Sequence, residues 1–323
     1  MIGAGMWAPR LAEAARLSGL RIVTCHSRGE ERRRAFAERF ACAEAGSLAE
    51  ALDHTEVEGA ILVTPNDTHA EQALACAERG KHVFVEKPIA DTVEAGERMR
   101  DACAAADVSL MVGHAFRRLG AARRTKELID EGALGRVVLA EANLSLPGSF
   151  GPQAWRAHRE RNPGGPLMQL GIHHVDTLLH WLGPVRRAGG RFAHVHTEAD
   201  IDDVGAVTLE LESGALAVVT GSYVSPKTLS LRLLGTSAVL DYSTDFSVWP
   251  NAAALDRATT LSLDGAPVEF EERDMLAEEL AEFGRCMRGE ARPETGAAEG
   301  LAALGAVLAA VRASEAAGGL TPA

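Results

Sequence analysis

The sequence predicts an α/β protein: a doubly wound parallel sheet followed by an α+β domain with a mostly antiparallel open sheet. In the first third of the chain, four short apolar runs lie at 20–25, 59–64, 82–86 and 108–113. Runs this continuous are typical of parallel strands that are buried on both faces. Beyond residue 115, as in 204–212, apolar residues alternate with polar ones. This alternation indicates antiparallel strands with one face exposed or packed on a partner.

The helices are expected where apolar residues recur at three- and four-residue spacing. Helices near 30–40, 67–79 and 91–106 separate the early strands, and this order is that of a doubly wound sheet. A helix near 120–131, a strand at 135–146, a helix within 164–183, a strand at 229–235 and closing helices near 275–289 and 297–317 follow. We therefore expect two domains, 1–114 and 115–323, with the closing helices as candidates for packing back on the first.

Composition excludes several classes of protein. The formal net charge is −12, and the one compact basic stretch, 28–39, also holds three glutamates, so we expect no nucleic-acid partner. No uninterrupted apolar run of about 18 residues is present, so we expect no membrane span. The five cysteines are an odd number without close pairing, and the chain starts without a basic region and apolar core. Both features favour reduced thiols in a cytoplasmic protein.

The chain opens with a glycine turn that is typical of dinucleotide-binding proteins. Gly3, Gly5 and Ala8 form a G-x-G-x-x-A pattern directly before a helical segment and the apolar run at 20–25. The free N–H groups at the start of such a helix can hold a pyrophosphate. The candidate cofactor contacts here are Gly3, Gly5, Met6, Trp7 and Ala8. Only Met1 and Ile2 precede the turn, so we expect a short or truncated first strand.

The end of the second strand predicts which cofactor is preferred. Sites that prefer NAD(H) usually place an acidic residue there to bind the ribose 2′-hydroxyl. His26, Ser27 and Arg28 occupy this point instead. A hydroxyl and a guanidinium suit a 2′-phosphate, so we predict NADP(H), with NAD(H) as the alternative. The competing interpretation is that Arg28 simply begins a surface helix.

A polar stripe follows the helix within 164–183. Gln169, His173, Asp176 and His180 are spaced i, i+4, i+7 and i+11, which places them on one helix face. Such a face is either a buried polar stripe or the wall of an active site. A metal site formed with His174 is disfavoured, because adjacent histidines on a helix diverge and no standard ligand spacing is present. We therefore predict no metal.

Three motifs together resemble the Gfo/Idh/MocA family, named after glucose–fructose oxidoreductase and inositol dehydrogenase. They are "GAGMWAPRLAEA" at the front, "VTPNDTHAEQALACAERGKHVFVEKPIA" at 63–90 and "GGPLMQLGIHHVDTLLHWLG" at 164–183. The resemblance implies a Rossmann domain, then an α/β domain whose open sheet often mediates dimers or tetramers. It also implies oxidation of a hydroxyl, or reduction of a ketone, on sugars, cyclitols or related small molecules.

The resemblance also implies roles for single residues. It places Thr64, Pro65, Asn66 and His69 beside the nicotinamide ribose. Glu86, Lys87 and Pro88 match an E-K-P motif whose lysine points at the reacting centre and whose Lys–Pro bond is often cis. His173 matches the catalytic histidine, and the candidate substrate contacts are Arg117, Trp155, Arg156 and His174. Many members carry an aspartate where this chain has Gln169.

Hydride transfer requires that a proton move at the substrate oxygen. A histidine can move it near neutral pH, and a lysine can polarise the same oxygen, so we assign these roles to His173 and Lys87. Gln169 cannot favour the imidazolium as an aspartate would, although it can orient the ring. Asp176 could replace the missing carboxylate if it faces His173. We therefore expect a less basic catalytic histidine than in aspartate-bearing relatives.

The leading hypothesis is an NADP(H)-dependent oxidoreductase of a sugar or polyol, assembled as a homodimer or homotetramer through the second domain's sheet. One alternative is a cofactor-binding regulator without turnover, for which the loss of the aspartate at Gln169 is the best argument. Another is a reductase of a non-sugar carbonyl, an imine or a dihydrodiol. Retention of both Lys87 and His173 favours an enzyme.

Overall fold

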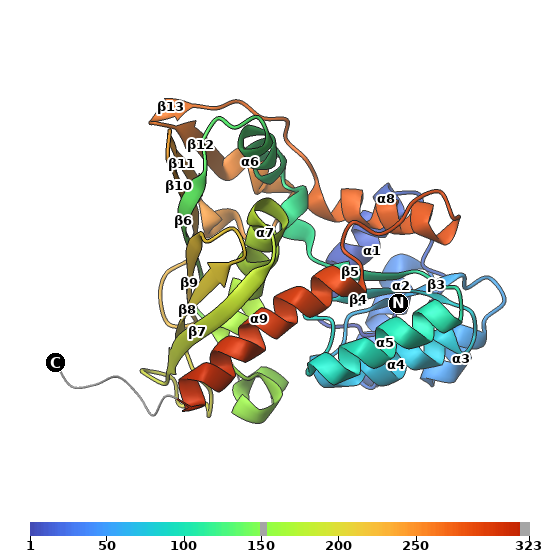
Figure 1. Cartoon of the computed structure of the whole chain (residues 1–323). Helices are drawn as coiled ribbons and strands as arrows, with labels where there is room; N and C mark the ends of the chain where they lie inside the picture. Colours follow the sequence, from blue (N-terminus) through green and yellow to red (C-terminus); the bar gives the residue numbers. More distant parts are fainter. Residues whose placement is uncertain (149–153, 317–323) are drawn as a thin grey trace. The chain divides into compact units, whose positions relative to one another are not determined.

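The computed structural model describes residues 1–148 and 154–316. The chain divides into two compact units (Figure 1). The first contains Met1–His114 and Leu276–Leu301, and the second contains Ala115–Met275 and the described residues from Ala302 onward. Each unit is built around its own sheet.

The first unit has a parallel sheet covered by helices. Its strands are β1 (Thr24–Cys25), β2 (Ala43–Glu44), β3 (Gly59–Leu62), β4 (His82–Glu86) and β5 (Leu110–Gly113). Its helices are α1 (Ala8–Leu17), α2 (Glu30–Phe40), α3 (Leu48–Asp53), the 3₁₀ turn η1 (Asn66–Thr68), α4 (His69–Ala77), α5 (Val93–Ala105) and α8 (Met275–Met287). The expected parallel sheet with helices between its strands is confirmed.

A single residue joins the two parts of this sheet. Ile2 forms parallel bridges to His26, just after β1, and to Leu62 in β3. The main-chain N–H of Ile2 donates to Ile61 at 2.9 Å, and its carbonyl accepts from Val63 at 2.8 Å. Ile2 therefore takes the position of the first strand, and the glycine turn begins at the carboxyl end of the sheet.

The centre of the first unit is apolar. Val83, Phe84 and Val85 of β4 are fully buried, as the continuous apolar run predicted. Phe283 of α8 packs edge-to-face on Phe84, with 5.8 Å between the ring centroids. A Cβ at Gly59 would lie 2.7 Å from the sulfur of Met287 and 3.1 Å from Phe283, so α8 lies very close to β3.

The second unit has an eight-stranded sheet in the order β13-β12-β11-β10-β6-β9-β8-β7. The strands are β6 (Val137–Ser145), β7 (Val185–Ala193), β8 (Val204–Leu211), β9 (Leu216–Ser222), β10 (Thr228–Gly235), β11 (Val239–Thr244), β12 (Thr259–Leu263) and β13 (Ala266–Pro267). Only the β6–β9 pair is parallel, so the prediction of a mostly antiparallel sheet is confirmed.

Helices cover one face of the second sheet (Figure 1). They are α6 (Gly120–Asp130), α7 (Ile172–Leu182), and short turns at η2 (Ala115–Arg118), η3 (Trp155–Ala157), η4 (Arg159–Arg161), η6 (Phe246–Val248), η7 (Ala252–Ala254) and η8 (Asp256–Ala258). The other face exposes alternate residues, such as Thr208, Arg232 and Asp241. The alternation in the sequence predicted this division into a covered and an open face.

Two features differ from or add to the predictions. The polar stripe does not lie on one uniform helix, because Leu167–Gly171 forms a π-helical turn (η5) directly before α7. α9 (Ala297–Ala316) begins in the first unit and ends in the second, and it is long and apolar enough to cross a bilayer. One such helix is weak evidence of a membrane span, because core helices pass the same test. All five cysteines are free thiols.

Candidate active site

The glycine turn is built for close approach of main chain. Gly3 has φ +98°, and a Cβ there would lie 2.3 Å from the carbonyl oxygen of Val63. Any other residue would therefore be strained and would collide with the strand. At Gly5 a Cβ would meet nothing within 4 Å, so space lies beside the turn.

The start of α1 fits a pyrophosphate. Trp7 precedes the helix without a side-chain cap, and the first turn contains Pro9 and no acidic residue. The start of the helix therefore has no carboxylate that would repel an anion. Met6, at the tip of the turn, is 88% exposed.

Arg10 is a candidate contact that the motif did not indicate. Its guanidinium donates to the carbonyl of Met6 at 2.7 Å and lies 5.4 Å from the centroid of the Trp7 ring. A cation in the first turn of a helix is unfavourable beside the helix dipole unless an anion binds there. That position, two residues after Ala8, was the signal in the sequence.

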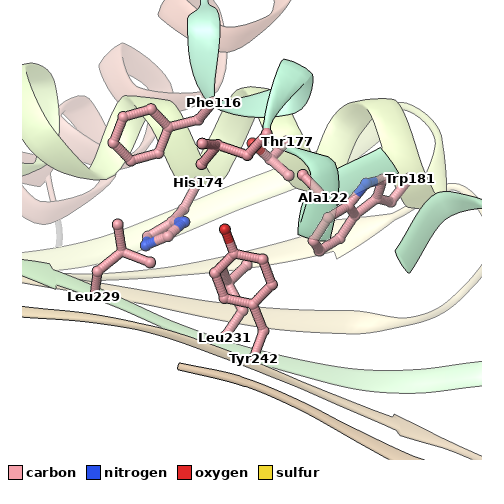
Figure 2. A pocket seen from close by; sticks show the side chains of 9 residues that line it. Phe116, Ala122, His174, Thr177, Trp181, Leu229, Leu231 and Tyr242 are labelled. Atoms are coloured by element: carbon pink, nitrogen blue, oxygen red, sulfur yellow. The ribbon is translucent and has the colours of Figure 1, made fainter. Parts of the chain in front are cut away.

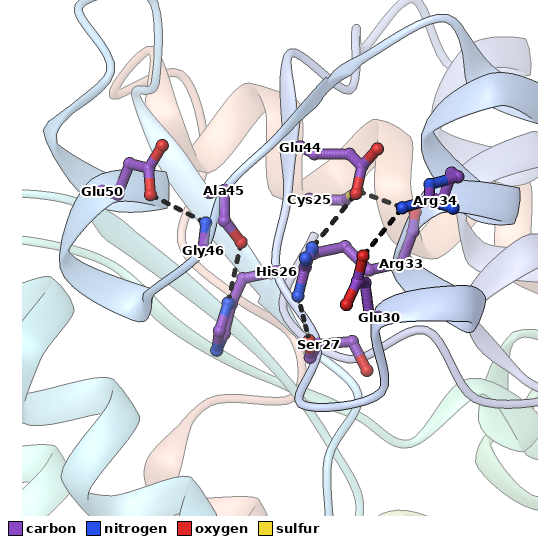
Figure 3. A network of polar contacts seen from close by, with 10 residues as sticks. All are labelled: Cys25, His26, Ser27, Glu30, Arg33, Arg34, Glu44, Ala45, Gly46 and Glu50. Carbon is purple, nitrogen blue, oxygen red and sulfur yellow. Dashed lines mark hydrogen bonds and ion pairs between the residues drawn. The ribbon is translucent and has the colours of Figure 1, made fainter.

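Polar contacts hold the loop after β1 in place (Figure 3). Arg33 donates to the carbonyl of Ser27 at 3.1 Å and pairs with Glu44, and the Nδ1 of His26 contacts the Ala45 carbonyl at 3.0 Å. Arg28 is exposed and forms no ion pair or hydrogen bond with the described residues. The carboxylate of Glu44 is paired with Arg33, and Arg28 could bind a phosphate.

Lys87 lies in a loop in which both neighbouring residues, Glu86 and Pro88, are held in place. Before it, the carboxylate of Glu86 accepts a 2.7 Å hydrogen bond from the indole N–H of Trp7. After it, the Lys87–Pro88 peptide bond is cis, as the motif implied, and Pro88 is buried. Glu86 thereby connects the E-K-P loop to the glycine turn at the carboxyl edge of the sheet.

His69 lies inside this edge rather than on its surface. Its ring is fully buried, with Nδ1 3.1 Å from the Pro88 carbonyl and 3.2 Å from that of Ile89. Its Nε2 lies 3.0 Å from the Thr64 carbonyl. Burial lowers the pKa of His69, and the three carbonyls oppose this shift.

The rest of the loop after β3 is tied together locally. The hydroxyl of Thr64 donates to Gln72 at 2.6 Å, and that of Thr68 donates to Thr64 at 2.9 Å and to the Pro65 carbonyl at 2.7 Å. Asn66 is buried in η1. The side chains of Thr64 and Pro65 remain half-exposed, so they are the members of this loop that could reach a nucleotide.

In the second unit, His173 is half-buried and stacked on Phe116. The two ring centroids are 4.1 Å apart and the planes are 17° from parallel. Phe116 itself is buried. One face of the imidazole is therefore covered by an aromatic ring that the sequence reasoning had not singled out.

His174 points to the sheet (Figure 2). Its Nε2 donates to the Asn143 carbonyl at 3.1 Å, and burial lowers the pKa of His174 to about 4. It lines a cavity of about 10 Å³ together with Trp181 and Tyr242. A cavity of this size holds about one water and no sugar, so His174 has a structural role rather than a substrate contact.

Gln169 belongs to a separate polar cluster. Its amide donates to the side-chain oxygen of Asn162 at 3.1 Å, and its oxygen accepts from Arg156 at 3.4 Å. The guanidinium of Arg156 lies 4.4 Å from the ring of Trp155. The W-R pair is thus next to Gln169, and both Trp155 and Arg156 are accessible.

Asp176 faces Arg117. The carboxylate accepts two hydrogen bonds from the guanidinium, one of them 2.9 Å from Nε, and both side chains are buried. The remaining nitrogen of Arg117 lies 3.4 Å from Nδ1 of His180. This arrangement favours a structural role for all three residues, and it leaves Asp176 unsuited to replace a carboxylate beside His173.

The predicted residues therefore form one group in each unit. The glycine turn, the Arg28 loop and the E-K-P loop lie at the carboxyl edge of the first sheet, as ligand sites do in such folds. His173 with Phe116 and the Gln169–Arg156 cluster lie around the start of α7 in the second unit. Within residues 1–148 and 154–316, no group of three or more potential metal ligands is found.

Comparison with known proteins agrees with this arrangement. The oxidoreductase family with an NAD-binding Rossmann fold matches residues 1–114, and the GFO/IDH/MocA C-terminal domain matches residues 122–241. The fold and the glycine turn thus define a Rossmann-fold oxidoreductase.

Individual relatives cover nearly the whole chain. D-xylose 1-dehydrogenase [NADP(+)] of Haloarcula marismortui is 29% identical over 98% of this chain and 90% of its own. D-xylose 1-dehydrogenase (NADP(+)) 2 of Haloferax volcanii is 30% identical over 88% and 86%. A crystal structure from Desulfitobacterium hafniense, described as a candidate NADPH-dependent oxidoreductase, superposes with a TM-score of 0.93 at 36% identity and covers 98% of this chain and 94% of its own. The chain belongs to the Gfo/Idh/MocA family of oxidoreductases.

Proposed function

We propose that this protein is an NADP(H)-dependent oxidoreductase that transfers a hydride at a hydroxyl or carbonyl carbon of a sugar, cyclitol or similar polyol. The observation that carries the proposal is the position of Lys87. Its loop is bonded to the glycine turn through Glu86 and Trp7, at the edge of the sheet where a nucleotide would bind.

The residues of the first unit would bind and orient the cofactor. The first turn of α1 and Arg10 would hold the pyrophosphate, and Gly5 would leave room for it. The nicotinamide supplies the hydride acceptor or donor. Thr64 and Pro65 would contact the ribose beside it. Lys87 would donate a hydrogen bond to the substrate oxygen and stabilise negative charge on it.

His173 would carry the proton. A histidine titrates in the range that proton transfer near neutral pH requires, and the Phe116 ring stacked on His173 would orient the imidazole. Arg156 and Trp155 would contact the substrate from the loop before η5.

The cofactor preference rests on Arg28 and on the pairing of Glu44 with Arg33. The two xylose dehydrogenases are named for NADP(+), which supports the same preference. The substrate class is supported by these two relatives and by the name of a 1,5-anhydro-D-fructose reductase of Ensifer adhaerens, which is 33% identical over 51% of this chain.

The test is an absorbance assay of nicotinamide reduction with D-xylose and a panel of sugars and polyols, run with NADP⁺ and with NAD⁺. We expect turnover with a lower Michaelis constant for NADP⁺. Lys87→Met and His173→Asn should each lower kcat at least about 100-fold, as loss of an acid–base or charge-stabilising group does. Arg100→Ala, whose side chain pairs with Asp101 on the surface of α5, is the control and should remain active.

Two outcomes would contradict this proposal. A clear preference for NAD⁺ would overturn the cofactor assignment. Tight binding of NADPH without turnover of any hydroxyl or carbonyl compound would favour a cofactor-binding regulator of the same fold.

We also propose that copies of the chain associate through the open face of the second sheet. Leu216 of β9 is 45% exposed and Val138 of the neighbouring strand β6 is 39% exposed, so both offer apolar area to a second copy. Light scattering of wild type and of Leu216→Glu tests this: a smaller particle in the variant supports it, and equal masses contradict it. The free thiols agree with the proposed cytoplasmic location.

A further inference from the structure

His69 contacts two loops of the first unit at once. Its Nδ1 faces the carbonyls of Pro88 and Ile89, directly after Lys87, and its Nε2 faces the carbonyl of Thr64, directly after β3. The ring is fully buried. It therefore lies between the loop that carries the candidate ribose contacts and the loop that carries Lys87.

These contacts leave the ring little to offer a nucleotide. A carbonyl oxygen only accepts hydrogen bonds, and a neutral imidazole carries a single N–H, so one ring nitrogen donates while the other edge packs against its carbonyl. An N–H at Nδ1 would serve two carbonyls, those of Pro88 and Ile89. The distances of 3.0 to 3.2 Å are those of ordinary hydrogen bonds. Both edges of the imidazole are occupied by main chain, and no part of the ring reaches solvent.

The contacts of His69 with the Pro88 and Ile89 carbonyls hold the main chain directly after Lys87. On its N-terminal side, Glu86 is held by the indole of Trp7 at 2.7 Å. The main chain of Lys87 is therefore fixed at both neighbours, by Trp7 through a side chain and by His69 through two carbonyls. A long, flexible side chain is placed reproducibly only if the main chain that carries it is fixed.

We propose that His69 is a positioning residue of the reaction: it holds the Pro88 and Ile89 carbonyls so that the ammonium of Lys87 meets the substrate oxygen, and it does not bind the cofactor. The inference rests on the proposed function for the role of Lys87. We call the contacts of His69 with the Thr64, Pro88 and Ile89 carbonyls the clamp, and they do not depend on the proposed function.

Two substitutions of His69 distinguish the contact made by Nδ1 from the contact made by Nε2. The side-chain nitrogen of asparagine can take the place of Nδ1, and that of glutamine can take the place of Nε2. His69→Asn therefore keeps a donor for Pro88 and Ile89, whereas His69→Gln keeps one for Thr64. His69→Leu removes the donor, whichever nitrogen carries the proton. His82→Leu is the control, because His82 lies at the opposite end of β4, where its Nδ1 accepts from the amide of Ser109.

We expect kcat with NADP⁺ and D-xylose to fall at least about tenfold in His69→Leu and His69→Gln, since displacement of a catalytic group by about 1 Å can cost about 100-fold. His69→Asn should stay within about threefold of wild type. The dissociation constant of NADPH, measured by its fluorescence, should change less than about threefold in all variants. His82→Leu should lower the melting temperature without lowering kcat.

A second measurement does not depend on turnover. Hydrogen–deuterium exchange of a peptide spanning residues 86–91 should be faster in His69→Leu and His69→Gln than in wild type, and unchanged in His69→Asn. If wild type has no activity but the exchange pattern holds, the proposed function fails and the clamp stands. If activity is present but the exchange pattern is absent, the clamp fails alone.

Three results would overturn the inference. A rise of tenfold or more in the NADPH dissociation constant with kcat retained would make His69 a cofactor ligand. Wild-type kcat and exchange in His69→Leu would show that nothing is clamped. Should His69→Leu not fold, equal activity and exchange in the asparagine and glutamine variants would refute the proposal.

Discussion

Arg156 determines what a carboxylate at position 169 would do. The Gln169 oxygen already accepts from Arg156 at 3.4 Å, and its amide donates to Asn162. An aspartate there would therefore lie beside a guanidinium as well as one turn from His173. The guanidinium would neutralise part of the charge that favours an imidazolium.

This arrangement predicts the outcome of a double substitution. Gln169→Asp should raise the apparent pKa of the acidic limb of kcat/KM slightly, because the carboxylate is shared with Arg156. Gln169→Asp combined with Arg156→Ala should raise it by about one pH unit, as an unshared opposite charge within several ångströms does. The measurement is the pH profile of kcat/KM for both variants and for Arg156→Ala alone. An acidic limb that stays in place in both aspartate variants would contradict the prediction.

Residue by residue, sequence reasoning identified types of side chain better than their partners. It identified the polar stripe of Gln169, His173, Asp176 and His180, yet among the described residues only Asp176 and His180 share a partner in the structure, Arg117. Asp176 binds Arg117, which precedes it by 59 positions, and His173 stacks on Phe116, which precedes it by 57. Spacing along a helix says which residues share a face, but contacts between distant segments depend on tertiary packing that spacing does not encode.

Within the glycine turn, Gly3 and Gly5 are needed for different reasons. At Gly3, a Cβ would lie 2.3 Å from the Val63 carbonyl oxygen and φ is +98°. At Gly5, a Cβ would enter open space. The first glycine is needed for folding, and the second would be needed only when a nucleotide is present.

Two alanine substitutions test this division. Gly3→Ala should lower the free energy of unfolding by more than about 1 kcal/mol, because alanine cannot adopt the positive φ without strain. Gly5→Ala should leave the free energy of unfolding within about 0.5 kcal/mol, but should weaken NADPH binding at least about tenfold. Chemical denaturation and NADPH fluorescence measure the two effects. Equal destabilisation by both substitutions would contradict the assignment.

At the level of elements, the long helices and central strands were predictable because their patterns are local. The helix expected near 30–40 is observed as Glu30–Phe40, and the run at 82–86 is β4. Short elements such as β2 and α3 were not identified, since two to six residues carry too little periodicity. The π-helical turn before α7 was also missed, because no particular residue type marks such a turn in the sequence.

For the whole molecule, buried histidines make stability depend on pH. Burial lowers the pKa of His174 to about 4, whereas an unfolded histidine has a pKa near 6.5. Between these values the unfolded chain binds a proton that the folded chain does not. Stability is therefore fully present above about pH 6.5 and is lost as the pH falls toward about 4. The lowered pKa of His69 acts in the same direction.

We expect the free energy of unfolding to fall by up to about 3 kcal/mol from His174 alone across this range. His174→Gln is the matched variant, since its amide can still donate to the Asn143 carbonyl but does not titrate. Denaturation at several pH values should give a flatter curve for His174→Gln than for wild type. Parallel curves for the two proteins would show that His174 is not responsible.

The outer strand β7 limits how molecules of this protein can aggregate. It is the last strand of the eight-stranded sheet and carries Arg186, Arg187 and Arg191, all exposed. A second molecule that extended the sheet from this strand would bring three more guanidinium groups alongside them. Such repulsion is a common protection of sheet edges, so growth of the sheet into fibres from this side is disfavoured.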